Sequence, residues 1–247
     1  MARASRDASN LRQSLRTVLC VAAHPDDIEF TVAGSVARWT REGREVTFCL
    51  VTTGGAGTNE HTPSSDGLIP IRERESREAA RILGVKDVIF LGYQDGVLEP
   101  TVPLRRDLTR VIRRCRPDVV VCGDPTVRYY GNEYMNHPDH RAASSAALDA
   151  VFPSAETRAI FPELLTEGLE PWKVKEVWIS GAMPPDAWID VGDTLETKCA
   201  ALKAHRSQVG PGEWVEPLLR SWAERDGKPA GVKHAEAFRR MVLWDGK

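Results

Sequence analysis

Two short segments of the chain combine histidine and aspartate in a pattern that could hold a metal ion. HPDD occupies residues 24–27, directly after an apolar run, and HPDH occupies residues 137–140. Adjacent carboxylates at the end of a strand repel each other and are costly to desolvate unless a positive charge lies among them. In each segment the first and fourth residues are three apart and proline follows the first. Such spacing favours a turn or helix start with both side chains on one face.

The residue types in these segments are those of a catalytic zinc site. His24, Asp27 and one histidine of the second segment would give three protein ligands and an open position for water. Each residue alone has a simpler explanation, as a helix cap or a hydrogen-bonded polar group. The pairing favours the metal, because three of the six histidines of the chain fall in these two segments together with three aspartates.

The composition is that of a globular protein without a general attraction to polyanions. The chain has 247 residues, of which 42% are hydrophobic, enough for one sizeable core. Lys and Arg number 33 against 35 Asp and Glu, a net charge of -2, so we expect neither nucleic acid nor a membrane as a partner. Residues 1–16 are basic and lack the apolar core of a secretory signal, so we expect a disordered arm.

The cysteines predict a reducing compartment. The five cysteines form no CxxC pair, and four of them lie in or beside apolar segments, where cysteine behaves as a small hydrophobic residue. We therefore expect free thiols and a cytoplasmic protein.

Apolar runs alternate with segments of helical spacing, which is typical of a parallel sheet covered by helices. Strands are predicted at 17–23, 46–53, 88–92 and 118–123, and helices at about 31–42, 70–83, 103–115 and 138–151. Beyond about residue 155, strands are predicted at 172–180 and 187–191 and a helix at about 193–205. We predict a single α/β domain over residues 17–247. It would be a Rossmann-like, open, mostly parallel sheet with helices on both faces and a small C-terminal β-containing extension.

Polar loops follow several of the predicted strands. Residues 52–70 are rich in Gly, Thr and Ser, and residues 124–136 are polar and aromatic. Both loops and both histidine segments fall at the carboxyl edge of the sheet, where open α/β sheets bind ligands. Neither GxGxxG nor GxxxxGK[ST] occurs, which weighs against a dinucleotide or P-loop site. Residues 212–231 carry no recognisable motif, and we expect them to shape the pocket entrance or a subunit contact.

Taken together, these segments resemble the PIG-L/LmbE-like family of metal-dependent N-deacetylases. AHPDD at 23–27, followed by Glu29, and HPDH at 137–140 look like its two signature motifs. Three further segments are similar to family patterns, TTGGAGT at 52–58, the helical stretch from IRERE to AARILGV at 71–85, and GYQDG at 92–96. Lys198 with the later His-x-Ser-Gln at 205–208 extends the resemblance over about residues 17–208.

The resemblance implies roles residue by residue. His24, Asp27 and His140 match the metal ligands, with Zn2+ as the ion and Fe2+ as the alternative. Asp26 matches the general base, and His137 matches the histidine that stabilises the oxyanion and protonates the leaving amine. The implied substrate is a small-molecule N-acylated sugar, most simply an N-acetyl glucosamine-like sugar or conjugate, and the implied assembly is a homo-oligomer.

Other positions match the family less directly. Arg72 and Asp95 match substrate-contacting positions in relatives that act on aminosugars. Gly55 stands where the family often carries Glu, which could remove a substrate contact. Asp139 is expected to orient its helix and the residues around the ligands rather than to bind the metal. The remaining histidines, His61, His205 and His234, are expected to be surface or packing residues.

Two other classes of function stay open from the sequence. Two histidines and one carboxylate also suit a non-haem metal oxygenase. A non-catalytic protein of the same fold could use the pocket to hold a sugar or nucleotide. The predicted parallel sheet and the extra carboxylate of Asp26 favour hydrolysis, and pure binding would need neither an open metal position nor a spare base.

Overall fold

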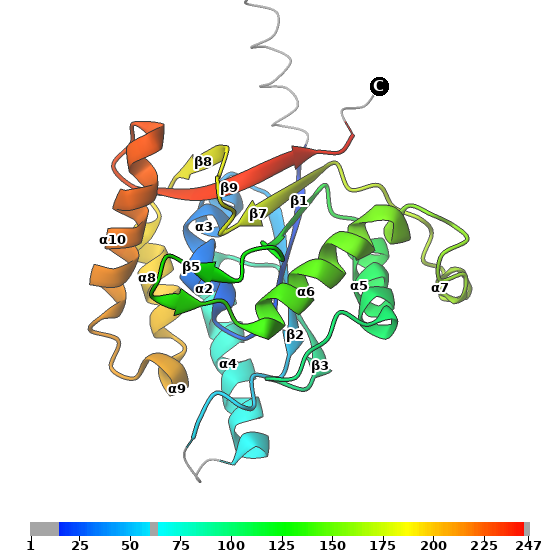
Figure 1. Cartoon of the computed structure of the whole chain (residues 1–247), viewed down its shortest axis with the longest axis horizontal. Helices are drawn as coiled ribbons and strands as arrows, with labels where there is room; N and C mark the ends of the chain where they lie inside the picture. Colours follow the sequence, from blue (N-terminus) through cyan, green and yellow to red (C-terminus); the bar gives the residue numbers. More distant parts are fainter. Residues whose placement is uncertain (1–14, 60–63, 245–247) are drawn as a thin grey trace, which may run out of the picture.

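A seven-stranded mixed sheet organises the molecule, in the order β3-β2-β1-β4-β7-β9-β8 (Figure 1). The structure is a computed structural model, which describes residues 15–59 and 64–244. Five strands run parallel, namely β1 (Thr17–Ala22), β2 (Glu45–Thr52), β3 (Asp87–Tyr93), β4 (Val119–Gly123) and β7 (Glu176–Ser180). Strand β9 (Ala235–Val242) lies antiparallel between β7 and β8 (Ala187–Asp190).

Helices cover both faces of this sheet because the central strands are apolar on both sides. In β2, Phe48 and Leu50 face the core shared with α3 (Ala33–Arg41) and α4 (Ser65–Leu83). The alternate residues Cys49 and Val51 face the core shared with α5 (Val102–Cys115) and α6 (Pro138–Asp149). This period of two is the pattern of a strand buried on both faces.

The remaining elements surround this framework. Helix α8 (Leu195–Lys203) and helix α10 (Val215–Gly227) stand side by side and share a third apolar cluster (Figure 1). A short hairpin, β5 (Tyr129–Tyr130) and β6 (Tyr134–Met135), precedes α6. The other short elements are α2 (Asp27–Thr31), a π-helix (Ala150–Ala155), α7 (Glu163–Thr166), α9 (Arg206–Val209) and a 3-10 turn (Lys228–Ala230).

The order of the strands creates a ligand-binding position at the carboxyl end of β1. The chain runs outward from β1 to β2 and β3, and then returns to the other side of β1 to form β4. Such a reversal leaves a crevice between the loops that follow the two central strands. The loop after β1 leads into HPDD, and HPDH spans the start of α6, with His137 as the residue before the helix.

The predicted fold class is confirmed, and several boundaries differ. Helix α4 begins at Ser65 rather than about residue 70, because the Ser64 side chain accepts a hydrogen bond from the Gly67 N–H and caps an earlier start. The helix predicted at 31–42 corresponds to α3, and the short helix α2, which ends just before Val32, was not predicted. The C-terminal strands join the main sheet through β7, and β9, α10 and the hairpin were not predicted.

The start of the described chain is packed against the domain. Most of the predicted basic arm, residues 1–14, lies outside the described residues. The last two residues of the predicted arm, Leu15 and Arg16, are packed against the domain. Leu15 is buried, and the Arg16 N–H donates to the Asp118 carboxylate. Among the described residues, none of the helices has the length and apolar character needed to cross a membrane.

Candidate metal centre

Side chains from both histidine segments converge at the carboxyl end of β1. His24, Asp27 and His140 each offer a ligand atom, and these atoms all lie within 4.8 Å of one another. His140 Nε2 lies 3.2 Å from His24 Nδ1 and 3.1 Å from Asp27 Oδ1, and His24 Nδ1 lies 3.5 Å from Asp27 Oδ2. Ligand atoms of a tetrahedral zinc site are about 3.4 Å apart, given Zn–N and Zn–O lengths near 2.0–2.1 Å. The donor set therefore fits such an ion.

Local backbone structure brings these ligands into place. Asp27 is the first residue of α2, and its Oδ2 accepts a hydrogen bond from the His24 N–H at 2.8 Å, which closes the turn between them. His140 lies in the first turn of α6, where Pro138 occupies a position that needs no N–H. Its Nδ1 lies 3.1 Å from Asn136 Oδ1, so Nε2 is the ring nitrogen left to face the ion.

Two aspartates lie against the other ring nitrogen of His24. Nε2 of His24 is 3.0 Å from Asp95 Oδ1 and 3.3 Å from Asp139 Oδ2. Asp139 is fully buried and also accepts the backbone N–H groups of Gly96 and Leu98 at 2.7 and 3.1 Å. A carboxylate on the far nitrogen of a ligating histidine fixes its tautomer and orientation. Asp139 therefore has the placement that its expected orienting role requires.

The charges of the centre favour a bound cation. Burial lowers the pKa of His24, but the hydrogen bonds to Asp27 and Asp95 raise it by more than burial lowers it. The resulting pKa is about 11. Burial raises the pKa of Asp27, while His140 and His24 hold it well below its usual range. Both shifts show that the carboxylates hold positive charge strongly at this position, which is the electrostatic requirement for a divalent metal.

Asp26 lies beside the ligands without being one of the three that converge. It is 9% exposed, and burial raises its pKa to about 7 although Arg72 acts in the opposite direction. Its Oδ2 accepts a hydrogen bond from Arg72 Nη2 at 3.0 Å. A buried carboxyl group that lies beside the three ligands without being one of them has the placement of a general base.

His137 lies next to the ligands on the more exposed side. Its ring centroid is 4.8 Å from that of His24 and 5.4 Å from that of His140. Its Nδ1 accepts the Asp139 N–H at 3.1 Å and so caps α6, which leaves the proton of the neutral ring on Nε2. Burial and the nearby His24 lower its pKa. A neutral imidazole with a free Nε2–H is a hydrogen-bond donor for a reacting oxygen.

The two predicted substrate contacts lie close to this centre. Asp95 contacts His24 as described and accepts the Ala56 N–H at 2.9 Å, and Arg72 contacts Asp26. Substrate contact by either residue stays a prediction.

The remaining histidines are not among the three converging ligands. His205 is fully buried, with Nε2 3.5 Å from Glu29 Oε2, whereas His61 lies outside the described residues. The contact of Glu29 with His205 and the contact of Asn136 with His140 were not predicted. Of these two residues, only Glu29 was noted in the sequence, as the glutamate that follows HPDD.

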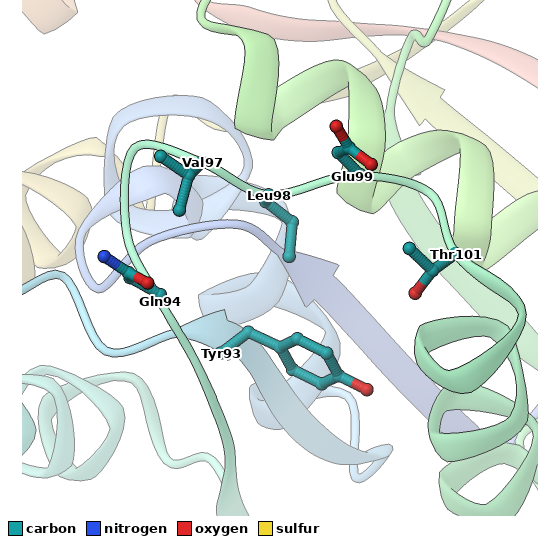
Figure 2. A pocket seen from close by; sticks show the side chains of 6 residues that line it. All are labelled: Tyr93, Gln94, Val97, Leu98, Glu99 and Thr101. Carbon is teal, nitrogen blue, oxygen red and sulfur yellow. The ribbon is translucent and has the colours of Figure 1, made fainter.

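A shallow depression lies beside the segment that carries Asp95. Figure 2 shows Tyr93 below the loop, with Gln94 and Val97 at one end and Thr101 at the other. The complete lining is Tyr93, Gln94, Val97, Leu98, Glu99 and Thr101. Asp95, in the same loop, contacts His24, whereas its neighbours in the sequence line the depression.

A family model matches the part of the chain that holds both histidine segments. The sequence model of the PIG-L family, described as GlcNAc-PI de-N-acetylase, matches residues 19–151, more than half of the chain. The chain belongs to the PIG-L family. The matched region includes both histidine segments and every residue assigned above to the metal centre.

Relatives of this PIG-L protein extend the match beyond residue 151. Diacetylchitobiose deacetylase from Thermococcus kodakarensis is 33% identical over 227 residues, covering 91% of this chain and 83% of that enzyme. A 1D-myo-inositol 2-acetamido-2-deoxy-alpha-D-glucopyranoside deacetylase from Saccharomonospora viridis is 32% identical over 238 residues, covering 79% and 86%. The solved N,N'-diacetylchitobiose deacetylase from Pyrococcus horikoshii has a TM-score of 0.86 at 33% identity, covering 94% and 86%.

Proposed function

We propose that this PIG-L protein is a zinc-dependent deacetylase that hydrolyses the acetamide of an N-acetylglucosamine-like sugar or sugar conjugate. The observation that carries the proposal is the convergence of His24, Asp27 and His140 with a separate carboxylate, Asp26, beside them. The deacetylases to which the chain is similar act on N-acetylated sugars by their names, which supports the substrate class.

The residues of the chain divide the hydrolysis between them. A divalent ion held by His24, Asp27 and His140 would lower the pKa of a water molecule and polarise the carbonyl of the amide. Asp26 takes the proton from the attacking water as the new C–O bond forms. His137 donates a hydrogen bond from Nε2 to the carbonyl oxygen as negative charge develops there. The leaving amine takes the proton that Asp26 accepted as the C–N bond breaks, and the products are acetate and the free amino sugar.

The experiment that tests this proposal combines metal analysis with acetate release. Zinc-loaded wild type and Asp26→Asn would be assayed on N,N'-diacetylchitobiose and on N-acetylglucosamine conjugates. We expect the variant to bind zinc normally and to lose about 100- to 10,000-fold in turnover, the usual contribution of a general base. Asp193→Asn, a change of the same chemistry at an exposed position, is the matched control and should keep full activity.

Two results would contradict the proposal. Undiminished turnover of zinc-loaded Asp26→Asn would remove Asp26 from the base role. Wild type that binds zinc but releases no acetate from any N-acetylated sugar would remove the assigned reaction, and consumption of oxygen by the iron-loaded protein would favour the oxygenase alternative.

The assembly and cellular location form a separate part of the proposal. The family resemblance supports a homo-oligomer, and light scattering of the purified protein would test it. The five cysteines are free thiols in the structure, and four are buried, which supports a cytoplasmic location.

A further inference from the structure

Helix α2 holds one proposed metal ligand and the candidate base at its start, but it is too short to fix its own position. It has five residues, begins at Asp27, and follows Asp26, whose φ of 102° lies in a region that residues other than glycine rarely adopt. An isolated helix is marginal below about 12–15 residues, and a strained backbone persists only where its surroundings hold it. The positions of Asp26 and Asp27 therefore depend on the groups that pack against α2.

A buried lysine binds the far end of this helix. Lys198 comes from α8, which packs against α2, and its Nζ donates to the Thr31 carbonyl at 2.8 Å. Thr31 is the last residue of α2, so the ammonium group lies at the negative end of the helix dipole. The Thr31 hydroxyl in turn donates to the Asp27 carbonyl at 2.7 Å, one turn earlier. Hydrogen bonds thus connect Lys198 through Thr31 to the proposed ligand.

Glu236, on β9, fixes the ammonium group of Lys198. Both side chains are 5% exposed, and Glu236 Oε1 accepts from Lys198 Nζ at 2.6 Å. The same carboxylate accepts the Gly34 N–H at 2.9 Å and the Ser35 N–H at 2.7 Å, in the first turn of α3. The ion pair therefore spans the junction at Val32, with its cation at the end of α2 and its anion at the start of α3.

The buried pair adds direction more than stability. A pair of this kind is often no more stabilising than apolar residues of the same volume, because both charges must be desolvated. Its hydrogen bonds, however, fix where the ends of the two helices lie. The backbone is also shaped to admit it, since a Cβ atom added to Gly34 would lie 2.9 Å from Glu236 Oε1, closer than real side chains approach.

A second buried contact from the same part of the chain supports α2 from the side. His205 is fully buried, and its Nε2 lies 3.5 Å from Oε2 of Glu29, which is in the middle of α2 and is also buried. Lys198, His205 and Glu236 all follow residue 151, where the match to the family model ends. The C-terminal part of the chain thus provides charged partners for the helix that begins at Asp27.

We propose that Lys198, held by Glu236, is a positioning residue that sets the place of α2 and, through it, of Asp27 at the metal centre and Asp26 beside it. This inference rests on the proposed function. The contacts of the Lys198 ammonium group are with Thr31 and Glu236, so it acts on the centre through α2 rather than by contact with the ligands.

The first test measures zinc affinity and kinetics of Lys198→Met. Methionine fills a similar volume but donates no hydrogen bond to Thr31, and Glu236 keeps its two backbone donors. We expect zinc affinity in chelator competition to fall about tenfold, as when an outer partner of a ligand is lost. With saturating zinc, we expect kcat for acetate release to fall by roughly 100-fold, the cost of a misplacement of about 1 Å, with KM unchanged.

The control separates positioning from a merely structural role. Lys203→Met replaces the other lysine of α8, whose side chain lies beside Gly212, and should match wild type in zinc affinity and kcat. A folded Lys198→Met with lowered Tm but wild-type zinc affinity and kcat would overturn the inference. If wild type released no acetate, the proposed function would fail, and the zinc affinities would still decide whether Lys198 positions Asp27.

The second test reads the ligand geometry directly. Cobalt(II) in place of zinc absorbs visible light at wavelengths that depend on the arrangement of its ligands. We expect the spectrum of cobalt-loaded Lys198→Met to differ from that of wild type, because Asp27 is displaced. Loss of stability alone would leave the spectrum of the folded protein unchanged, so identical spectra would overturn the inference.

A further variant covers the case in which Lys198→Met does not fold. The double variant Lys198→Met/Glu236→Gln neutralises both partners and so leaves no unpaired buried charge. It also lacks the contact with Thr31, and we expect the same tenfold loss of zinc affinity as in Lys198→Met. Wild-type zinc affinity in the folded double variant would contradict the positioning role.

Discussion

Replacement of Asp139 by Asn should weaken metal binding although Asp139 is not one of the three proposed ligands. Three donors approach its carboxylate, namely the Gly96 N–H at 2.7 Å, the Leu98 N–H at 3.1 Å and His24 Nε2 at 3.3 Å. The carboxylate of Asp139 can accept from all three, whereas Asn offers one oxygen and an NH2 group. At least one donor would then face another donor in a fully buried position.

The expected magnitude follows from these contacts. A buried donor left without an acceptor costs about 1–3 kcal/mol of folding free energy. Loss of a carboxylate that orients a ligating histidine typically costs about 10- to 100-fold in metal affinity. Because Asp95 Oδ1 remains 3.0 Å from His24 Nε2, the ring keeps one acceptor. We therefore expect Asp139→Asn to lie near the lower end, at about tenfold weaker zinc binding, or ~1.4 kcal/mol.

Competition with a chromophoric chelator would measure the zinc affinity of wild type and Asp139→Asn, with Tm recorded for both. Asp149→Asn, at an exposed position on the same helix, is the matched control and should bind zinc like wild type. Zinc affinity equal to wild type in folded Asp139→Asn would show that the Asp139 contact does not orient His24, and the reasoning about the ligand would be wrong.

Two further predictions concern stability away from the metal centre. Burial raises the pKa of Asp118, but the Lys175 ammonium and backbone N–H groups lower it more, to below its usual value. Its contribution is therefore present above the unfolded pKa of about 3.9 and lost as pH falls through the folded pKa. Urea unfolding of Asp118→Asn should show a loss of about 1.5–3 kcal/mol at pH 7 that shrinks in acid, and a loss independent of pH would contradict this. Glu236 and Lys198 form a buried pair at 2.6 Å, so Glu236→Gln should cost about 3–5 kcal/mol by leaving an unpaired buried charge. Adding Lys198→Met should recover part of that loss, and purely additive losses would refute the pairing.

The fold class and the two segments that converge at the candidate metal centre could be predicted because their signals are local. Apolar runs such as VTFCLVTT at 46–53 mark buried strands within a few residues. HPDD holds His24 and Asp27 three positions apart, and HPDH holds His137 and His140 at the same spacing. Strand β9, by contrast, reads AEAFRRMV, which mixes charged and apolar residues without a clear period. Its place in the sheet comes from pairing with β7 and β8, more than 40 residues earlier in the chain. The strand propensities of the residues in a short window give no information about such long-range pairing.

The sequence by itself determined which residue types were available for metal and proton chemistry and that they follow strands of a parallel sheet. Only the tertiary structure decided their partners. The pairing of β1 with both β2 and β4 brings His140 within 3.2 Å of His24 across 116 residues of sequence, and Arg72 reaches Asp26 across 46. The physical reason is that strand register and packing fix distances between remote side chains, while sequence spacing fixes them only within one turn or strand.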